Sequence, residues 1–168
     1  MNVMKNIKID KVTLNFGAGK DQKRLEKGAQ LIEMITGKKP VKTHTQSRIP
    51  GWGLRPGLPI GLKLTLRGKE AEDVLKRLLE AKENRLSDSC VDDYGNVSFG
   101  LSEYIDIPGI KYDPKIGVIG LQASITLTRP GYRVMRRKNK TSRVSDEHKV
   151  NKKEALAFMK ERFSVEFA

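Results

Sequence analysis

The sequence contains a single cysteine, Cys90, and only two histidines, His44 and His148. One cysteine excludes an internal disulfide framework, and these three residues do not have the spacing of a usual zinc site. Three aspartates lie within three residues of Cys90, which is the opposite of the electropositive setting of a reactive cysteine. We therefore expect no catalytic residue, no bound metal and no cofactor, in a chain suited to the reducing cytoplasm.

Long apolar runs are also missing. No stretch approaches the length of a membrane span, and the first ten residues, MNVMKNIKID, lack the continuous apolar segment of a signal peptide. We therefore expect a cytoplasmic protein with no membrane partner. Hydrophobic residues nevertheless make up 38% of the 168 residues, which is enough for one domain, residues 1–168, with a sizeable core.

Acidic residues are absent between Glu33 and Glu70, where eight Lys and Arg residues occur. A second basic segment, residues 129–153, has ten basic and two acidic residues, whereas residues 70–113 have eleven acidic and five basic ones. The whole chain carries a net charge of +13, which points first to a nucleic acid and second to an anionic membrane surface. The membrane alternative needs a basic amphipathic helix beside a lipid anchor, and the sequence has neither.

Three segments have the alternation of half-buried strands. In residues 60–66, aliphatic residues alternate with glycine, lysine and threonine, and residues 120–128 repeat such a pattern. Residues 6–16 predict a third strand, whose apolar phase changes at Asp10-Lys11. That change indicates a bulge there or a strand that begins at Lys11.

The remaining predicted elements are helices over 21–36 and 70–84, short strands over 41–45 and 99–107, and a C-terminal helix after Asn151. Glu154 lies three residues after Asn151, as in a capping box. The basic segment, residues 129–153, has weak periodicity and little apolar content. We expect it to lack fixed structure until it meets phosphate.

The three clear strands each have an outward row of side chains. The rows are Lys11, Thr13 and Asn15; Lys63, Thr65 and Arg67; and Gln122, Ser124, Thr126 and Thr128. None of these residues is a carboxylate. If the strands share a sheet, its open face offers hydrogen-bond donors and positive charge to ribose and phosphate. An ordinary solvated face usually carries some acidic residues, so we favour a binding face.

The loop of residues 46–58 separates two predicted strands and is rich in proline and glycine. Trp52, the only tryptophan, lies near its tip between Arg48 and Arg55. Two interpretations are open for this ring. It could stack on a nucleic-acid base or ribose, or it could fold back as the loop's own small core.

Two other motifs do not support a chemical function. The GAGK segment at residues 17–20 lacks both the first glycine and the Ser or Thr of a P-loop, so we expect a turn into a helix. Asp92 and Asp93 fit a solvated turn better than a divalent-ion site. Because no nucleophile with its base and no metal set is found, we expect a protein that is not an enzyme.

Five motifs, in order along most of the chain, closely resemble one known family. They are KVTLNFGAG at 11–19, TGKKPVKT at 36–43, RPGLPIGLKLTLRG at 55–68, IPGIKYDPKIGVIGL at 107–121 and RPGYRVMRRK at 129–138. The family is the universal large-subunit ribosomal protein number five, which binds 5S rRNA, and the basic C-terminal segment resembles its archaeal form. The resemblance implies an α+β fold, with an antiparallel β-sheet, helices packed on one face and a long basic loop between two strands.

The resemblance also implies a structural place in the central protuberance of the large ribosomal subunit, beside neighbouring ribosomal proteins. Asn15, Lys38 and Thr65 would lie on the face that binds 5S rRNA, and the basic segment would contact large-subunit rRNA. The 46–58 loop would contact the peptidyl-site tRNA through Gln46, Arg48, Trp52 and Arg55. Together with the outward rows, the expected rRNA-binding residues are Lys11, Thr13, Asn15, Lys38, Lys39, Lys63, Thr65, Arg67, Arg129, Arg133, Arg136, Arg137 and Lys138.

Two rival functions remain to be weighed against a ribosomal role. A free-standing sequence-specific regulator would place a basic helix in a groove, but the predicted helices over 21–36 and 70–84 carry mixed charge. An RNA-modifying enzyme would need a cofactor pocket and would retain a bound nucleotide or methyl donor. Equal affinity for duplex DNA would favour the regulator.

Overall fold

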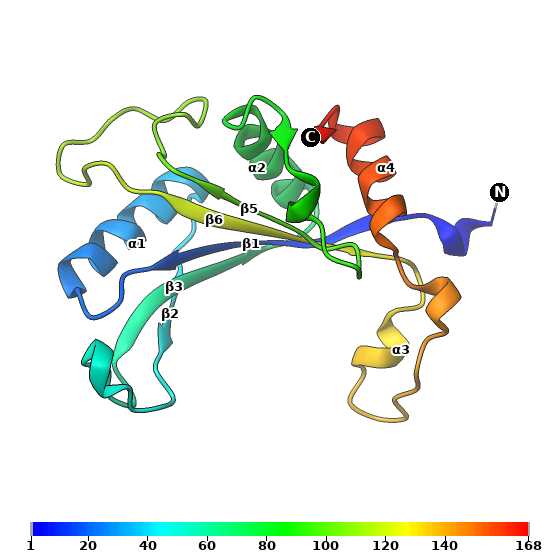
Figure 1. The fold of residues 1–168 in the computed structure, drawn as a ribbon, viewed down its shortest axis with the longest axis horizontal. Helices are drawn as coiled ribbons and strands as arrows, with labels where there is room; N and C mark the ends of the chain where they lie inside the picture. The colour runs from blue at the N-terminus through cyan, green and yellow to red at the C-terminus, as the bar shows by residue number, and fades with distance from the viewer. Residues whose placement is uncertain (1, 168) are drawn as a thin grey trace.

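The computed structural model describes residues 2–167 (Figure 1). Five strands form one antiparallel sheet in the order β2-β3-β1-β6-β5. The strands are β1 (Lys8–Gly17), β2 (Val41–His44), β3 (Pro59–Leu66), β5 (Val97–Leu101) and β6 (Leu121–Thr128). The larger helices are α1 (Gln22–Thr36), α2 (Lys69–Glu80) and α4 (Lys152–Phe163), and Figure 1 shows all three on one side of the sheet. The predicted α+β class is therefore confirmed.

Several short elements complete the chain. They are the helix α3 (Arg133–Arg136), the parallel pair β4 (Arg85–Leu86) and β7 (Glu166–Phe167), and 3-10 turns at Val3–Lys5, Pro50–Trp52, Asp88–Cys90 and Asp146–His148. The sequence patterns do not predict these elements, because pieces of two to four residues are too short to show a period.

The core lies between the helices and the inward rows of the sheet. In the central strand β1, Leu14 pairs with Leu64 of β3 and with Ala123 of β6, and all three side chains are buried. The predicted alternation of β3 and β6 is thus confirmed. The bulge is confirmed as well, since the register between β1 and β6 shifts between Ile9 and Lys11.

Helix α1 begins and ends where the sequence predicts. The Asp21 carboxylate accepts the backbone N–H groups of Lys23 and Arg24 at 3.0 and 3.2 Å, which caps the first turn. Gly37 ends the helix with a φ of 68°, the left-handed conformation that glycine adopts without strain. Within the helix, a side chain at Gly28 would overlap the ring of Phe16 in β1, so glycine allows the helix to approach the sheet closely.

Two predicted elements are longer than the observed ones. The strand over 99–107 ends at Leu101, because Tyr104 turns inward: its side chain is fully buried and its hydroxyl accepts the Asp113 N–H at 3.0 Å. The helix over 70–84 ends at Glu80, because Glu83 and Asn84 have positive φ values of 54° and 55°.

Candidate nucleic-acid interface

The outward rows of the three clear strands lie side by side on one face of the sheet. Thr13 of β1 pairs with Thr65 of β3 and with Ser124 of β6. Two residues on, Asn15 pairs with Lys63 and Gln122 in the same way. We call the face formed by Lys11, Thr13, Asn15, Lys63, Thr65, Gln122, Ser124, Thr126 and Thr128 the open face. It lies on the side of the sheet away from α1, α2 and α4 (Figure 1).

The open face consists of hydroxyl, amide and amine groups. Asn15 Nδ2 donates to Gln122 Oε1 at 3.0 Å, and the hydroxyl groups of Ser98 in β5 and Ser124 in β6 are 3.1 Å apart. Lys63 is exposed and adds a full positive charge. Such groups can hydrogen-bond both phosphate oxygens and the 2′-hydroxyl of ribose.

One carboxylate lies at the end of this face, and the alternation pattern misses it. The β-bulge inserts Asp10 before Lys11, and its side chain is largely covered. Its two oxygens accept Arg67 Nη1 at 3.1 Å and Arg136 Nη1 at 2.7 Å. Both arginines are predicted rRNA contacts, and in the free protein each is paired with Asp10.

The 46–58 loop projects from the open-face side of the sheet (Figure 1). Its base continues the β2–β3 ladder, because Thr45 exchanges backbone hydrogen bonds of 2.9 Å with Leu58 and Gly57. Ile49 and Leu54 form a bridge across the tip.

The exposure of the side chains at the loop tip distinguishes the two interpretations of Trp52. The Trp52 side chain is 70% exposed, whereas Leu54 is buried. Trp52 is therefore not the core of the loop and is free to stack. Gln46, Arg48 and Arg55 are also exposed.

The basic segment forms a second projection on the same side (Figure 1), and it is more ordered than the sequence indicates. Tyr132 and His148 close its base: the Val150 N–H donates to the Tyr132 hydroxyl at 2.8 Å, and the two rings meet edge to face at 6.0 Å. His148 Nε2 lies 2.8 Å from the Pro130 carbonyl oxygen. The expectation of a segment without fixed structure is therefore wrong.

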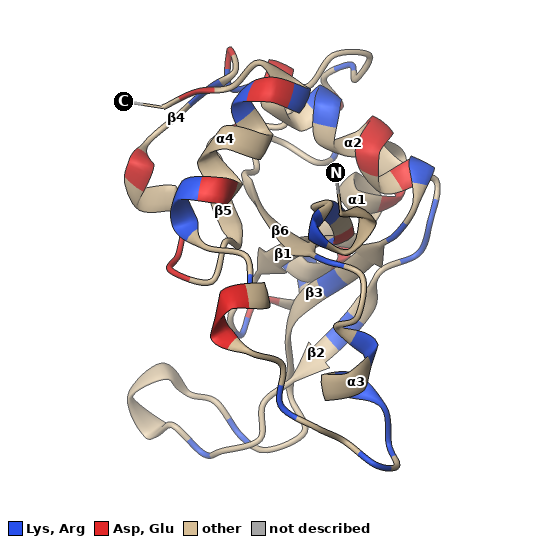
Figure 2. Ribbon diagram, turned by 90° about the vertical axis from the view of Figure 1, so that its right-hand side faces the viewer, with Lys and Arg blue, Asp and Glu red and all other residues tan. Residues whose placement is uncertain are grey.

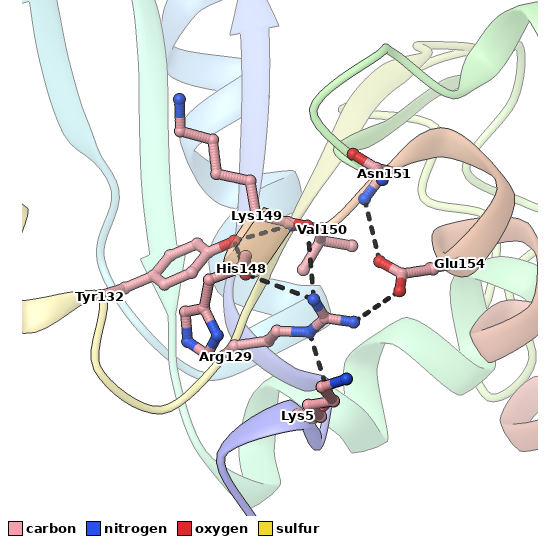
Figure 3. A network of polar contacts seen from close by, with 8 residues as sticks. All are labelled: Lys5, Arg129, Tyr132, His148, Lys149, Val150, Asn151 and Glu154. Carbon is pink, nitrogen blue, oxygen red and sulfur yellow. Dashed lines mark hydrogen bonds and ion pairs between the residues drawn. The ribbon is translucent and has the colours of Figure 1, made fainter. Parts of the chain in front are cut away.

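Arg129 anchors this segment from the interior (Figure 3). Its side chain is only 6% exposed. Nε donates to the Lys5 carbonyl at 3.1 Å, Nη1 to the carbonyls of His148 and Lys149 at 3.3 and 3.4 Å, and Nη2 to the Glu154 carboxylate at 2.6 Å. The structure thus places Arg129 away from the surface, so we correct its assignment as an rRNA contact.

The Glu154 carboxylate is held in its charged form by this network. Its partial burial alone would raise its pKa, but hydrogen bonds from Arg129 and from the Asn151 N–H, together with the charge of Arg129, lower the pKa below the ordinary value. Glu154 Oε2 accepts the Asn151 N–H at 3.2 Å, as the predicted capping box requires. The residue therefore both caps α4 and neutralises Arg129.

The exposed charges are unevenly distributed. Figure 2 shows acidic residues on α2, on nearby loops and on the turn at Asp146–His148, and both signs on α4, whereas α3 and the loop after it carry basic residues. Arg133, Arg137 and Lys138 are exposed there, and residues 129–145 contain no acidic residue.

A few acidic residues lie near the basic groups and pair with them. At the end of the basic loop, Asp146 has a lowered pKa because Lys149 donates a hydrogen bond to it and Arg143 adds positive charge. At the start of α2, Glu70 pairs with the half-exposed Lys38, while Lys39 is exposed. Lys38 is therefore available to RNA only in competition with Glu70.

Other kinds of site are not found in the described part of the chain. Within residues 2–167, no group of three or more His, Cys, Asp or Glu side chains is placed to hold a metal ion. Asp92 instead caps its own turn, since its carboxylate accepts the N–H groups of Tyr94 and Asn96 at 3.0 and 2.7 Å. None of the helices in this range is long and apolar enough to cross a membrane.

An open sheet face of hydroxyl, amide and lysine groups between two basic projections defines a nucleic-acid-binding protein. Comparison with known sequences identifies its family. The family model of ribosomal protein L5 matches residues 2–55, and the model of the C-terminus of the same ribosomal family matches residues 59–158. The chain belongs to the ribosomal protein L5 family.

Individual relatives are similar over nearly their whole length. The large ribosomal subunit protein uL5 of Sulfolobus acidocaldarius is 49% identical over 98% of this chain and 92% of its own. Those of Nanoarchaeum equitans and Methanoculleus marisnigri are 48% and 44% identical, over 97% and 99% of this chain and 96% and 99% of their own. The predicted resemblance to the archaeal form is confirmed. Because the relatives are ribosomal proteins, the prediction that the chain is not an enzyme is confirmed too.

Proposed function

We propose that this ribosomal protein binds 5S rRNA through its open face, large-subunit rRNA through the basic segment, and the peptidyl-site tRNA through the 46–58 loop. A structural role in the large ribosomal subunit, in the cytoplasm, follows from its family. The resemblance to the family implies which RNA each surface meets, and the geometry and charge of the surfaces described above support RNA binding there.

The observation that carries RNA binding by the open face is the alignment of the outward rows, and the family resemblance makes 5S rRNA the expected partner. Thr13 lies between Thr65 and Ser124, and Asn15 lies between Lys63 and Gln122. An RNA strand laid across β3, β1 and β6 would meet hydroxyl and amide groups at each step. These groups can satisfy 2′-hydroxyls, and the lysines can neutralise phosphates. Lys11 adds positive charge to the same face, and we assign Lys38 and Lys39, which lie between α1 and β2, to the same RNA.

The basic segment suits large-subunit rRNA because Arg133, Arg137 and Lys138 are exposed and residues 129–145 contain no acidic residue. We assign this contact to Arg133, Arg136, Arg137 and Lys138. Arg129 holds the segment in place from within and is left out of the contact surface.

The 46–58 loop, which the family resemblance assigns to tRNA, suits RNA binding because it presents an exposed tryptophan between two arginines. Trp52 can stack on a base or ribose, and Arg48 and Arg55 can reach the flanking phosphates. Gln46 can add a hydrogen bond at the base of the loop. The loop lies at the opposite end of the sheet from the basic segment in Figure 1, so the two projections can hold different RNAs.

The acidic side of the molecule suits protein partners rather than RNA. We assign the neighbouring ribosomal proteins of the central protuberance to this side, which includes residues 70–90. We also propose that the whole chain acts as one domain, because the sheet takes strands from both matched segments: β1 and β2 precede residue 55, and β3, β5 and β6 follow it.

A competition titration tests the assignment. The full chain is bound to labelled 5S rRNA at about 0.2 M salt, where non-specific electrostatic binding is weak, and is challenged with unlabelled tRNA and duplex DNA. We expect the 5S rRNA complex to survive both competitors. Equal displacement by tRNA, duplex DNA and unlabelled 5S rRNA would mean that the open face recognises charge alone, and would overturn the proposal.

A further inference from the structure

A small cavity lies where the basic segment meets the open face. Its volume is about 200 Å³, and its lining comes from three separate parts of the chain. The turn before β5 contributes Tyr94, the open face contributes Thr126, and the basic segment contributes Tyr132, Met135, Arg136 and Lys149. None of the functions proposed above accounts for this cavity.

One wall of the cavity is aromatic and apolar. Tyr94 is 70% exposed, yet its backbone is fixed, because its N–H donates to the Asp92 carboxylate at 3.0 Å. The next residue, Gly95, packs so closely on Val150 that a side chain there would overlap it. The backbone of this turn is therefore fixed, so only the side-chain torsions of Tyr94 remain to be ordered on binding.

The other wall carries positive charge. Arg136 is half exposed and uses only Nη1 in its pair with Asp10, so its remaining donors are available. Lys149 donates to Asp146 at 2.6 Å and has an ammonium group with further donors. Between the two walls, Thr126 belongs to the open face and pairs in register with Lys11.

The network around Arg129 holds the cavity in shape (Figure 3). It fixes Lys149 through the Lys149 carbonyl, and the neighbouring Val150 N–H fixes the Tyr132 hydroxyl. The Lys149 backbone and the Tyr132 ring are therefore positioned before any ligand arrives, and the Lys149 side chain is held by its ion pair with Asp146. A preformed site of this kind binds with a smaller loss of conformational entropy than a mobile one.

We propose that this cavity binds a single unpaired RNA base, stacked on Tyr94, with its phosphate facing Arg136 and Lys149. The volume supports one base rather than two, since sites for drug-sized ligands measure roughly 300–1,000 Å³. Splayed-out bases that stack on aromatic side chains are the usual way in which proteins read unpaired RNA. The inference rests on the proposed RNA-binding function, because the cavity is continuous with the open face through Thr126.

The test compares three full-chain variants on two RNAs, 5S rRNA and large-subunit rRNA, each titrated separately. Tyr94→Leu removes the aromatic ring, Tyr94→Phe keeps it, and Tyr112→Leu removes a ring that is 52% exposed on a loop outside the cavity. We expect Tyr94→Leu to weaken binding of at least one RNA about tenfold. Tyr94→Phe and Tyr112→Leu should stay within about twofold of the wild type, and the salt dependence should not change because no charge is lost.

The outcomes separate this inference from the proposed function. If the wild type binds neither RNA, the proposed function fails. If the wild type binds one or both RNAs and Tyr94→Leu binds them with the same affinity as the wild type, the cavity holds no base. In that case only the inference fails. A loss as large in Tyr94→Phe as in Tyr94→Leu would also overturn it, since the hydroxyl rather than the ring would then matter. Thermal unfolding of each variant checks that the exposed substitutions leave the fold intact.

Discussion

Arg129 Nη2 lies 2.6 Å from Glu154 Oε1, and this pair joins the first residue of the basic segment to the first turn of α4. The same guanidinium reaches the carbonyls of Lys5, His148 and Lys149. Composition assigns Arg129 to the RNA surface. Its side chain instead attaches the basic segment to the body of the protein. The basic segment leaves the body of the protein and returns to it beside this pair, and Arg136 contacts Asp10 of β1 as a second attachment.

Replacing Arg129 with alanine should lower the free energy of unfolding by about 2–4 kcal/mol, because three carbonyls and a carboxylate lose a charged partner. Denaturant unfolding measures this loss. The matched control is Arg143→Ala, which removes an exposed arginine from the same segment and should have a much smaller effect. If Arg129→Ala kept wild-type stability but lost RNA affinity, Arg129 would be a phosphate contact after all.

The Arg129–Glu154 pair should make stability depend on acid pH. The folded protein lowers the pKa of Glu154 below its ordinary 4.5. The pair therefore contributes its full stabilisation above that value, and the contribution is lost as pH falls through the lowered folded pKa. Unfolding experiments at a series of pH values should show the wild type losing its advantage over Glu154→Gln below about pH 4.5. A constant difference between the two proteins down to about pH 2 would contradict this assignment.

Substituting Lys63 and Thr65 on the open face with alanine should weaken 5S rRNA binding without unfolding the protein. Both side chains are exposed, while the alternate residues Leu62, Leu64 and Leu66 fill the core. The slope of log affinity against log salt should fall by about one, as expected for one lost phosphate contact. Lys111→Ala, at an exposed position on the loop between β5 and β6, should change neither affinity nor slope. A loss of helical and sheet signal in circular dichroism would instead mean that the face is structural.

Replacing Trp52 and Arg55 with alanine should leave 5S rRNA affinity within about twofold and impair tRNA placement in assembled large subunits. The physical reason is the separation of the loop tip from the open face, together with the loss of a stacking platform that is worth about 1–3 kcal/mol per base. Filter binding of peptidyl-site tRNA to subunits reconstituted with each variant measures the effect. A collapse of 5S rRNA binding would show that the loop serves the other RNA.

The parts of the fold that follow a regular period could be predicted from the sequence. Four leucines or isoleucines alternate cleanly through β3, and Gly37 marks the end of α1 because only a left-handed residue fits there. The period-two pattern beyond Leu101 is misleading. Tyr104 and Ile107, three residues apart, are buried there as anchors of an irregular loop, whereas Ile105, which belongs to the period-two phase, is 38% exposed.

The parts of the site that depend on long-range pairing could not be predicted. Arg129 and Glu154 are 25 residues apart, and nothing in composition distinguishes a buried arginine from an exposed one. The change of strand phase correctly locates the bulge at Asp10, but the alternation rule does not say where the inserted side chain goes. Counting charges locates the basic surfaces, but it overestimates how many of their Lys and Arg residues lack an acidic partner.

Asp10 also affects how the free protein binds RNA before it joins a ribosome. A newly made chain moves among many RNAs that are not its target. Arg67 and Arg136 each give only Nη1 to Asp10, so a phosphate can still reach their remaining donors. The nearby carboxylate repels that phosphate, however. The residue inserted in β1 thus lowers the net positive charge at this end of the open face and weakens the attraction of any RNA that reaches only this end.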